Sequence, residues 1–114
     1  MRLALAQLEI EGGTVDANCE RAEAAIAAAA ERGADLVALP EIFNVGYFAF
    51  DSYRREAESL TGPTLTRMAD AAREHGVGVL AGTIVEDLAA TETAPTPAEE
   101  GLANTAVLFD RDGE

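Results

Sequence analysis

Short apolar runs that end at turn-forming residues predict four strands in this chain. The runs cover residues 2–8, 36–39, 77–85 and 104–109. Residues 36–39 are continuously apolar and stop at Pro40, which is typical of an interior strand of a parallel sheet. Residues 2–8 alternate only weakly, so we expect that strand to be buried on both faces as well.

Apolar residues spaced three and four apart predict two helices. The first begins near Asp16, a candidate N-cap, and ends near Arg32, with Gly33 in the position that follows a helix. Most of its inward positions are alanine, which lets a helix lie close against a sheet. The second helix opens at residues 61–63, with a proline in its first turn, and ends at Gly76.

Two stretches between these elements lack a regular period. Residues 41–60 hold five of the six aromatic side chains and a possible short helix over residues 52–58. The aromatic side chains form either a hydrophobic lid over the core or the wall of a pocket. Residues 86–101 are rich in acids and prolines, so we expect a solvated loop that leaves Glu86 exposed at the end of a strand.

The alternation of strands and helices implies an α/β fold with a largely parallel sheet and right-handed crossovers. A length of 114 residues fits one domain or part of one. Ligands of open α/β sheets bind beyond the carboxyl ends of the strands. The residues that follow each predicted strand are therefore the first candidates for a site.

Composition narrows the classes of function. The chain carries 21 acidic residues against eight basic ones, all arginine, which gives a net charge of −13. Such a chain repels polyanions, so phosphate-directed binding of nucleic acid is disfavoured, and a P-loop is excluded because it requires a lysine. Replacement of lysine along the whole chain favours adaptation to high salt over the demand of any single site.

Single cysteine and histidine residues exclude a disulfide framework and disfavour a structural zinc site. Cys19 lies on the apolar stripe of the first helix, which indicates a structural role. Gln7 and Glu9 interrupt the N-terminal apolar run, so it does not resemble a signal peptide, and no run approaches the roughly 20 residues of a membrane span. We expect a cytoplasmic protein without membrane contact.

Glu41 is the strongest candidate for chemistry. It follows the apolar strand at residues 36–39 directly, and aromatic residues come after it. Partial desolvation there would raise the pKa of its carboxyl group and make it a usable general base near neutral pH. The competing interpretation is an ordinary exposed acid in a loop, which position alone favours.

The context of Glu41 resembles a known family. Residues 34–47 are similar to the first signature of the carbon–nitrogen hydrolase (nitrilase) superfamily, where a strand ending in Leu-Pro-Glu is followed by Gly-Tyr. Further segments resemble those of the family in the same order along the whole chain. These segments are residues 5–7, 16–18, 62–69, 82–86 and 104–107.

The resemblance implies an α-β-β-α sandwich, of which residues 1–114 would form a partial domain, largely one sheet with two helices. It also implies a Glu-Lys-Cys triad that hydrolyses a small non-peptide amide or nitrile without cofactor or metal. Glu41 would be the general base and Tyr47 would shape the substrate pocket, with Phe43 and Asn44 as further substrate-binding candidates. Asn104 is expected to make a structural hydrogen bond.

Two members of that triad have no counterpart here. The chain contains no lysine, and Cys19 matches neither the lysine nor the cysteine position of the family. We therefore expect residues 1–114 alone to be inactive, as a truncated gene product, a fragment or one piece of a split enzyme. A complementing C-terminal half or a second copy would then be the partner. The alternative is a non-catalytic α/β module for interaction or small-ligand binding.

Overall fold

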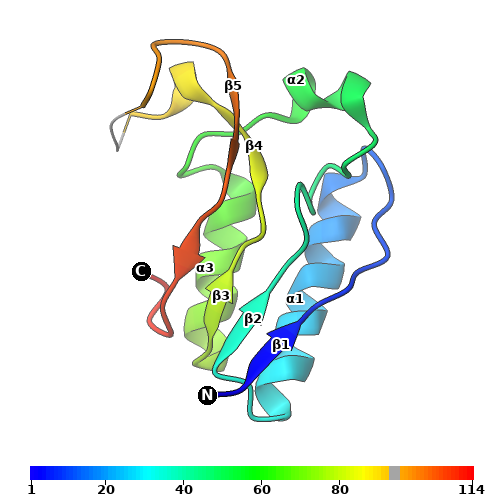
Figure 1. Ribbon diagram of the computed structural model, residues 1–114, viewed down its shortest axis with the longest axis vertical. Coiled ribbons are helices and arrows are strands. Elements are labelled where there is room, and N and C mark those ends of the chain that lie inside the picture. The colour runs from blue at the N-terminus through cyan, green and yellow to red at the C-terminus, as the bar shows by residue number, and fades with distance from the viewer. Residues whose placement is uncertain (93–95) are drawn as a thin grey trace.

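The computed structural model describes residues 1–92 and 96–114 (Figure 1). Its elements follow the chain in the order β1 (Leu3–Leu5), α1 (Val15–Glu31), β2 (Leu36–Ala38), η1 (Phe50–Ser52), α2 (Tyr53–Glu56), α3 (Pro63–His75), β3 (Gly78–Leu80), β4 (Ile84–Asp87), η2 (Leu88–Ala90), β5 (Leu102–Thr105) and β6 (Leu108–Phe109).

A four-stranded sheet organises the fold. Strands β1, β2 and β3 run parallel, and β6 pairs antiparallel with β3 at one edge. Strands β4 and β5 form a separate antiparallel ribbon, which continues β3 and β6 past the carboxyl ends of the parallel strands (Figure 1). The predicted α/β class with a largely parallel sheet is confirmed.

The core lies between this sheet and two helices that cover one of its faces (Figure 1). Ile26 of α1 and Met68 of α3 are fully buried against Val37 of β2 and Val79 of β3. Small residues of α1 such as Ala22 are buried at the same contact, which is the close helix–sheet approach that the alanine stripe predicted.

The opposite face of the sheet is open in the described part of the chain. Leu3 and Leu5 of β1 are 57% and 76% exposed, and Leu108 of β6 is 61% exposed. The expectation that the first strand is buried on both faces is therefore wrong. Both helices pack on the same side, so only alternate residues of β1 turn toward the core.

Two of the predicted strands are each divided in the structure. The predicted strand 77–85 is two strands, β3 and β4, with Gly82 at φ +41° between them. The predicted strand 104–109 is likewise β5 followed by β6. The division lets the chain leave the main sheet, form the β4–β5 ribbon and return, a change that a continuous apolar run does not reveal.

Glu86 is a second correction. It lies inside β4 and is only 4% exposed, where we expected a solvated strand end. Hydroxyl groups of Thr91 and Thr105 donate to its two carboxylate oxygens at 2.6 and 2.8 Å. These hydrogen bonds replace the water that the carboxylate loses on burial.

The helix termini agree with the sequence except at one position. Pro63 lies in the first turn of α3, and Gly76 ends that helix in the left-handed conformation, as predicted. Asp16 is not the N-cap of α1, because Thr14 occupies that place and Asp16 lies in the first turn. None of the helices among the described residues has the length and apolar character that crossing a membrane requires.

Candidate active site

Glu41 lies immediately beyond the carboxyl end of β2. The amide of Leu39 donates to the carbonyl of Leu80 at 2.9 Å, which keeps the chain on the sheet until Pro40. A tight turn then follows, closed by the Gly46 amide on the carbonyl of Ile42 at 2.8 Å. Glu41 thus occupies the edge of the parallel strands at which α/β folds bind ligands.

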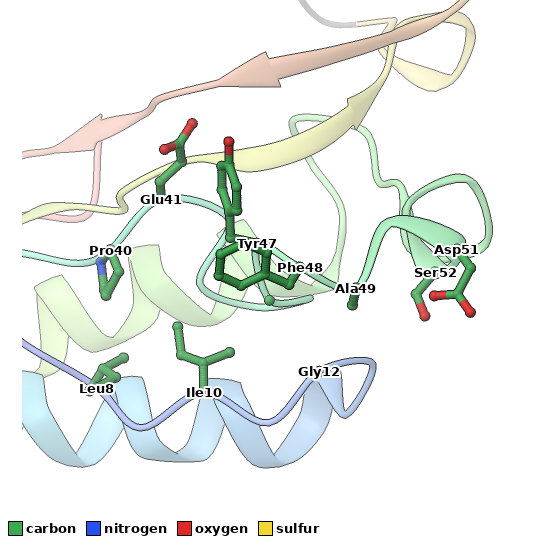
Figure 2. Close-up of a pocket in the computed structure, with 11 residues that line it drawn as sticks. Leu8, Ile10, Gly12, Pro40, Glu41, Tyr47, Phe48, Ala49, Asp51 and Ser52 are labelled. Atoms are coloured by element: carbon green, nitrogen blue, oxygen red, sulfur yellow. The ribbon is translucent and has the colours of Figure 1, made fainter.

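A pocket of about 630 Å³ opens beside Glu41 (Figure 2). Residues 8–12 form one side of it and residues 40–52 form the other. Leu8, Ile10 and Phe48 contribute apolar surface, while Glu41 and Asp51 contribute the two carboxylates of the lining. None of the described lining residues is basic.

A buried asparagine joins the two sides of this pocket. Asn18 of α1 is fully buried and makes two hydrogen bonds with the backbone of Glu11. The Glu11 amide donates to Oδ1 of Asn18 at 2.9 Å, and Nδ2 of Asn18 donates to the Glu11 carbonyl at 2.8 Å. The same side-chain amide donates to the carbonyl of Asn44 at 2.8 Å. Asn18 belongs to the family-like segment 16–18, but its spacing in the sequence does not predict this role.

The surroundings of Glu41 differ from our expectation. Its side chain is exposed in this structure, whereas we expected partial desolvation. Among the described residues, its carboxylate accepts one hydrogen bond, at 2.7 Å from the side-chain amide of Asn104 in β5 to Oε1. Asn104 therefore makes the structural hydrogen bond that was expected of it, and the bond reaches the candidate catalytic acid.

Aromatic rings extend the wall of the pocket. Tyr47 packs edge-on against Phe48, with ring centroids 5.1 Å apart, and Phe50 continues the cluster to Tyr53. The Tyr53 hydroxyl donates to the carbonyl of Tyr47. Desolvation raises the pKa of Tyr53, and Tyr47 and Glu41 raise it further. Tyr47 and Phe48 line the pocket, so this part of the aromatic segment forms a pocket wall.

Phe43 and Asn44, the two weaker substrate-binding candidates, lie outside the pocket lining. Phe43 is fully buried in the main core. Asn44 is 1% exposed and donates to the Thr64 hydroxyl at 3.0 Å and to Glu58 at 3.3 Å. Both side chains therefore anchor the turn that follows Glu41 to the interior of the protein.

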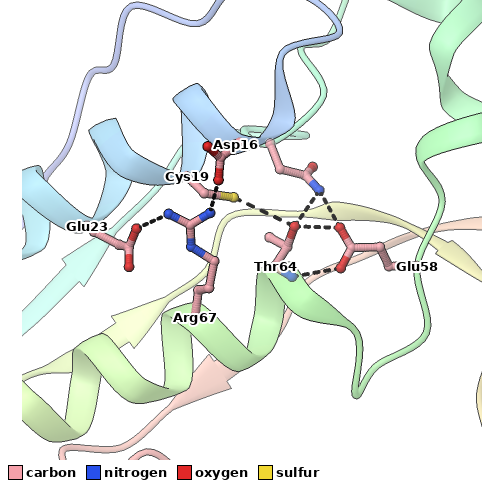
Figure 3. Close-up of polar contacts among 7 residues, drawn as sticks. Asp16, Cys19, Glu23, Glu58, Thr64 and Arg67 are labelled. Atoms are coloured by element: carbon pink, nitrogen blue, oxygen red, sulfur yellow. Dashed lines mark hydrogen bonds and ion pairs between the residues drawn. The ribbon is translucent and has the colours of Figure 1, made fainter.

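Figure 3 shows the polar cluster that surrounds Cys19. The Cys19 thiol lies 3.7 Å from the hydroxyl of Thr64. The backbone amide of Thr64 donates to the carboxylate of Glu58 at 2.7 Å. Burial raises the pKa of the Cys19 thiol. Arg67 of α3 binds Asp16 of α1 at 2.8 Å nearby. The cysteine is thus a buried part of the contact between α1 and α3, in line with the structural role we predicted.

A group of carboxylates at residues 110–114 lies apart from this site. Asp110, Asp112 and Glu114 bring one oxygen each within 4.8 Å of the others, all of them exposed. Oδ1 of Asp110 accepts the backbone amides of Asp112 and Glu114 at 2.8 and 3.1 Å. These bonds are those of an ordinary aspartate turn, and none of the three residues lines the pocket.

Comparison with known sequences points to one family. A family model described as carbon–nitrogen hydrolase matches residues 2–114. The chain is 36% identical over 114 residues to omega-amidase NIT2 of Homo sapiens, covering 98% of this chain and 36% of that protein. It is also 36% identical over 80 residues to a 2-oxoglutaramate amidase of Paenarthrobacter nicotinovorans, covering 70% of this chain and 25% of that protein.

Solved structures give the same result. A Saccharomyces cerevisiae member of branch 10 of the nitrilase superfamily superposes with a TM-score of 0.79 at 28% identity, over 98% of this chain and 40% of that one. An amidase from Nesterenkonia sp. superposes with a TM-score of 0.76 at 25% identity, over 100% of this chain and 40% of that one. The chain thus spans well under half the length of the relatives it matches.

Proposed function

Because the chain belongs to the carbon–nitrogen hydrolase family, we propose that it supplies the general base of an amidase-type active site. The reaction is hydrolysis of a small non-peptide amide, or of a nitrile, by a Glu-Lys-Cys triad. Glu41 is the glutamate of that triad and Tyr47 shapes the substrate pocket. The lysine and the cysteine come from outside residues 1–114, because the chain has no lysine and Cys19 is buried in a helix contact.

The observation that carries the proposal is the position of Glu41. It belongs to the family-like Leu-Pro-Glu segment and stands at the carboxyl edge of the parallel strands beside the pocket. Figure 2 shows its carboxylate and the ring of Tyr47 extending in the same direction. A carboxylate in that place can accept a proton from a nucleophile approaching over the pocket.

Two proton transfers define the role of Glu41. In the first, its carboxylate takes the proton of the cysteine thiol while sulfur bonds to the amide carbon, and that proton leaves with the departing ammonia. In the second, Glu41 takes a proton from the water that attacks the resulting thioester, and the thiol is restored as the acid product leaves. A lysine ammonium stabilises the negative charge that develops on oxygen.

The lining of the pocket favours an uncharged amide. Its described residues offer apolar side chains and the carboxylates of Glu41 and Asp51, with no basic group. A substrate carrying its own carboxylate would be repelled on this side of the site. We propose an amide rather than a nitrile as the main substrate, since several of the relatives are named amidases.

A chimera tests this function. Residues 1–114 replace the matching segment of the Nesterenkonia amidase, and ammonia release from butyramide, a ligand of one solved form of that enzyme, is measured. We expect the chimera to release ammonia and residues 1–114 alone to release none. A folded chimera without activity would contradict the proposal. A second chimera, made with the human omega-amidase, guards against failure to fold in the first.

One observation favours a second candidate function, an interaction module. The open face of the sheet exposes Leu3, Leu5 and Leu108, which suits contact with another polypeptide. A complementing C-terminal half or a second copy would cover such a face in either case. The two functions separate in the chimera, because an interaction module confers no ammonia release on it.

A further inference from the structure

The residue after Glu41 adopts a backbone conformation that its side chain disfavours. Ile42 has φ +48°, the one positive φ of a non-glycine residue among those the structure describes. A β-branched residue in the left-handed region is a costly exception. Such a conformation persists only where neighbouring groups enforce it, and these cases concentrate at functional sites.

Three contacts enforce it here. The side chain of Ile42 is 4% exposed and packs against Val45 and Val85. Its amide donates to the Thr83 hydroxyl at 2.8 Å. The third contact is with the residue before Glu41: a Cβ at Gly82 would stand 1.9 Å from the carbonyl oxygen of Pro40, so the backbone of Gly82 lies directly against Pro40.

The carboxylate of Glu41 is held from the same direction. Asn104 donates to Oε1 at 2.7 Å, and no donor in the described part of the chain reaches Oε2. Asn104 pairs with Val85 across the β4–β5 ribbon, and Thr83 stands directly before β4. The ribbon and the residue directly before it therefore contact both the side chain of Glu41 and the backbone that follows it.

We propose that Thr83 and Asn104 are positioning residues, which together aim Oε2 of Glu41 at the proton it accepts. Thr83 acts through the amide of Ile42, and Asn104 acts through Oε1. The catalytic purpose of this arrangement rests on the proposed function, but the conformations of Ile42 and Glu41 can be measured without turnover. A carboxylate with one oxygen fixed and the other open is pre-organised for proton transfer.

The test is NMR spectroscopy of residues 1–114 with two variants of Thr83. Thr83→Val keeps the shape of the side chain and removes the acceptor, whereas Thr83→Ser keeps the acceptor and removes a methyl group. In Thr83→Val we expect the Ile42 amide to exchange with solvent about tenfold faster, and the strong intraresidue amide–Hα NOE of a positive φ to weaken. Thr83→Ser should resemble the parent chain. The reverse order would mean that Thr83 only packs, and would overturn the proposal.

A second pair of variants keeps the test decisive if Thr83→Val does not fold. Asn104→Ala should average the side-chain couplings of Glu41 to those of a free glutamate. Leu102→Ala, two residues away on the same face of β5, should leave them unchanged. Unchanged couplings in Asn104→Ala would overturn the proposal. An inactive chimera would contradict the proposed function and leave these measurements untouched, so the two failures are distinguishable.

Discussion

The side chains around Glu41 divide into those that face the pocket and those that support it. Glu41 and Tyr47 stand at the pocket, while Phe43 and Asn44, between them in sequence, are buried. Asn44 links the turn to Thr64 and Glu58, which are next to Cys19. A change in this buried cluster should therefore alter stability before it alters chemistry.

The buried thiol of Cys19 should make the stability of the chain depend on pH. Burial raises the pKa of its thiol in the folded chain, so the folded state holds the thiol proton more tightly than the unfolded state does. The thiol therefore contributes fully to the free energy of unfolding below about pH 8.5, the pH at which an unfolded thiol begins to ionise. Above that pH the free energy of unfolding should fall, by at most about 1.4 kcal/mol per pH unit. Urea unfolding between pH 7.5 and 9.5 measures this slope.

The matched control is Cys19→Ala, which removes the thiol. Tyr53, whose pKa burial also raises, remains in both proteins, so the difference between their slopes isolates the cysteine. Equal slopes would show that the Cys19 thiol does not resist ionisation. Reaction of folded parent chain with iodoacetamide at the rate of a free thiol would lead to the same conclusion.

The sequence motif predicted which segment carries the site, but not which of its side chains face the pocket. The Leu-Pro-Glu segment identified Glu41 and Tyr47 as candidates, but it did not separate them from Phe43 and Asn44. The direction of each side chain in this turn depends on the positive φ of Ile42, which residue type argues against.

At the level of elements, helices were predicted better than strands. Proline in the first turn and glycine at the C-terminus define α3 through local backbone preferences, which can be read from sequence. The separation of β3 from β4 instead depends on the contact of Gly82 with Pro40, which lies directly before Glu41 and about 40 residues away in the chain. A glycine inside an apolar run predicts a close approach or a bulge at Gly82, but it does not identify the distant segment that approaches.

A side chain at Gly82 should destabilise the junction between β3 and β4. Gly82→Ala would put a Cβ 1.9 Å from the Pro40 carbonyl oxygen and 2.7 Å from that of Leu39. Since both obstacles are backbone, we expect a loss of about 3 kcal/mol or more in the free energy of unfolding. Gly76→Ala is the control, because it also has a positive φ but meets nothing within 4 Å. It should cost about 1 kcal/mol. Similar losses in urea unfolding would refute the close contact.

For the whole molecule, charge and the open sheet face act together. A net charge of −13 on 114 residues opposes compaction, and in the described part of the chain helices cover one face of the sheet and leave the other open. Screening of this charge by salt should therefore favour the folded state. Partnership of the open face with a complementing half or a second copy would add the missing burial.

Salt should therefore stabilise the chain. We expect the melting temperature to rise by about 5 °C or more between 20 mM and 1 M NaCl, which corresponds to roughly 1 kcal/mol for a chain of this size. Glu20→Gln, at an exposed position of α1, should raise the melting temperature at low salt and have little effect at high salt. A melting temperature that does not change with NaCl would contradict the role given to charge.

We propose that Glu41 is the general base of a carbon–nitrogen hydrolase site. The most direct test is the turnover of butyramide by the active chimera with Glu41→Gln, beside Glu74→Gln at the exposed C-terminal end of α3 as a matched control. We predict that Glu41→Gln lowers kcat at least about a hundredfold while Glu74→Gln leaves it unchanged. A folded Glu41→Gln chimera that kept kcat within about twofold of the parent would contradict the claim.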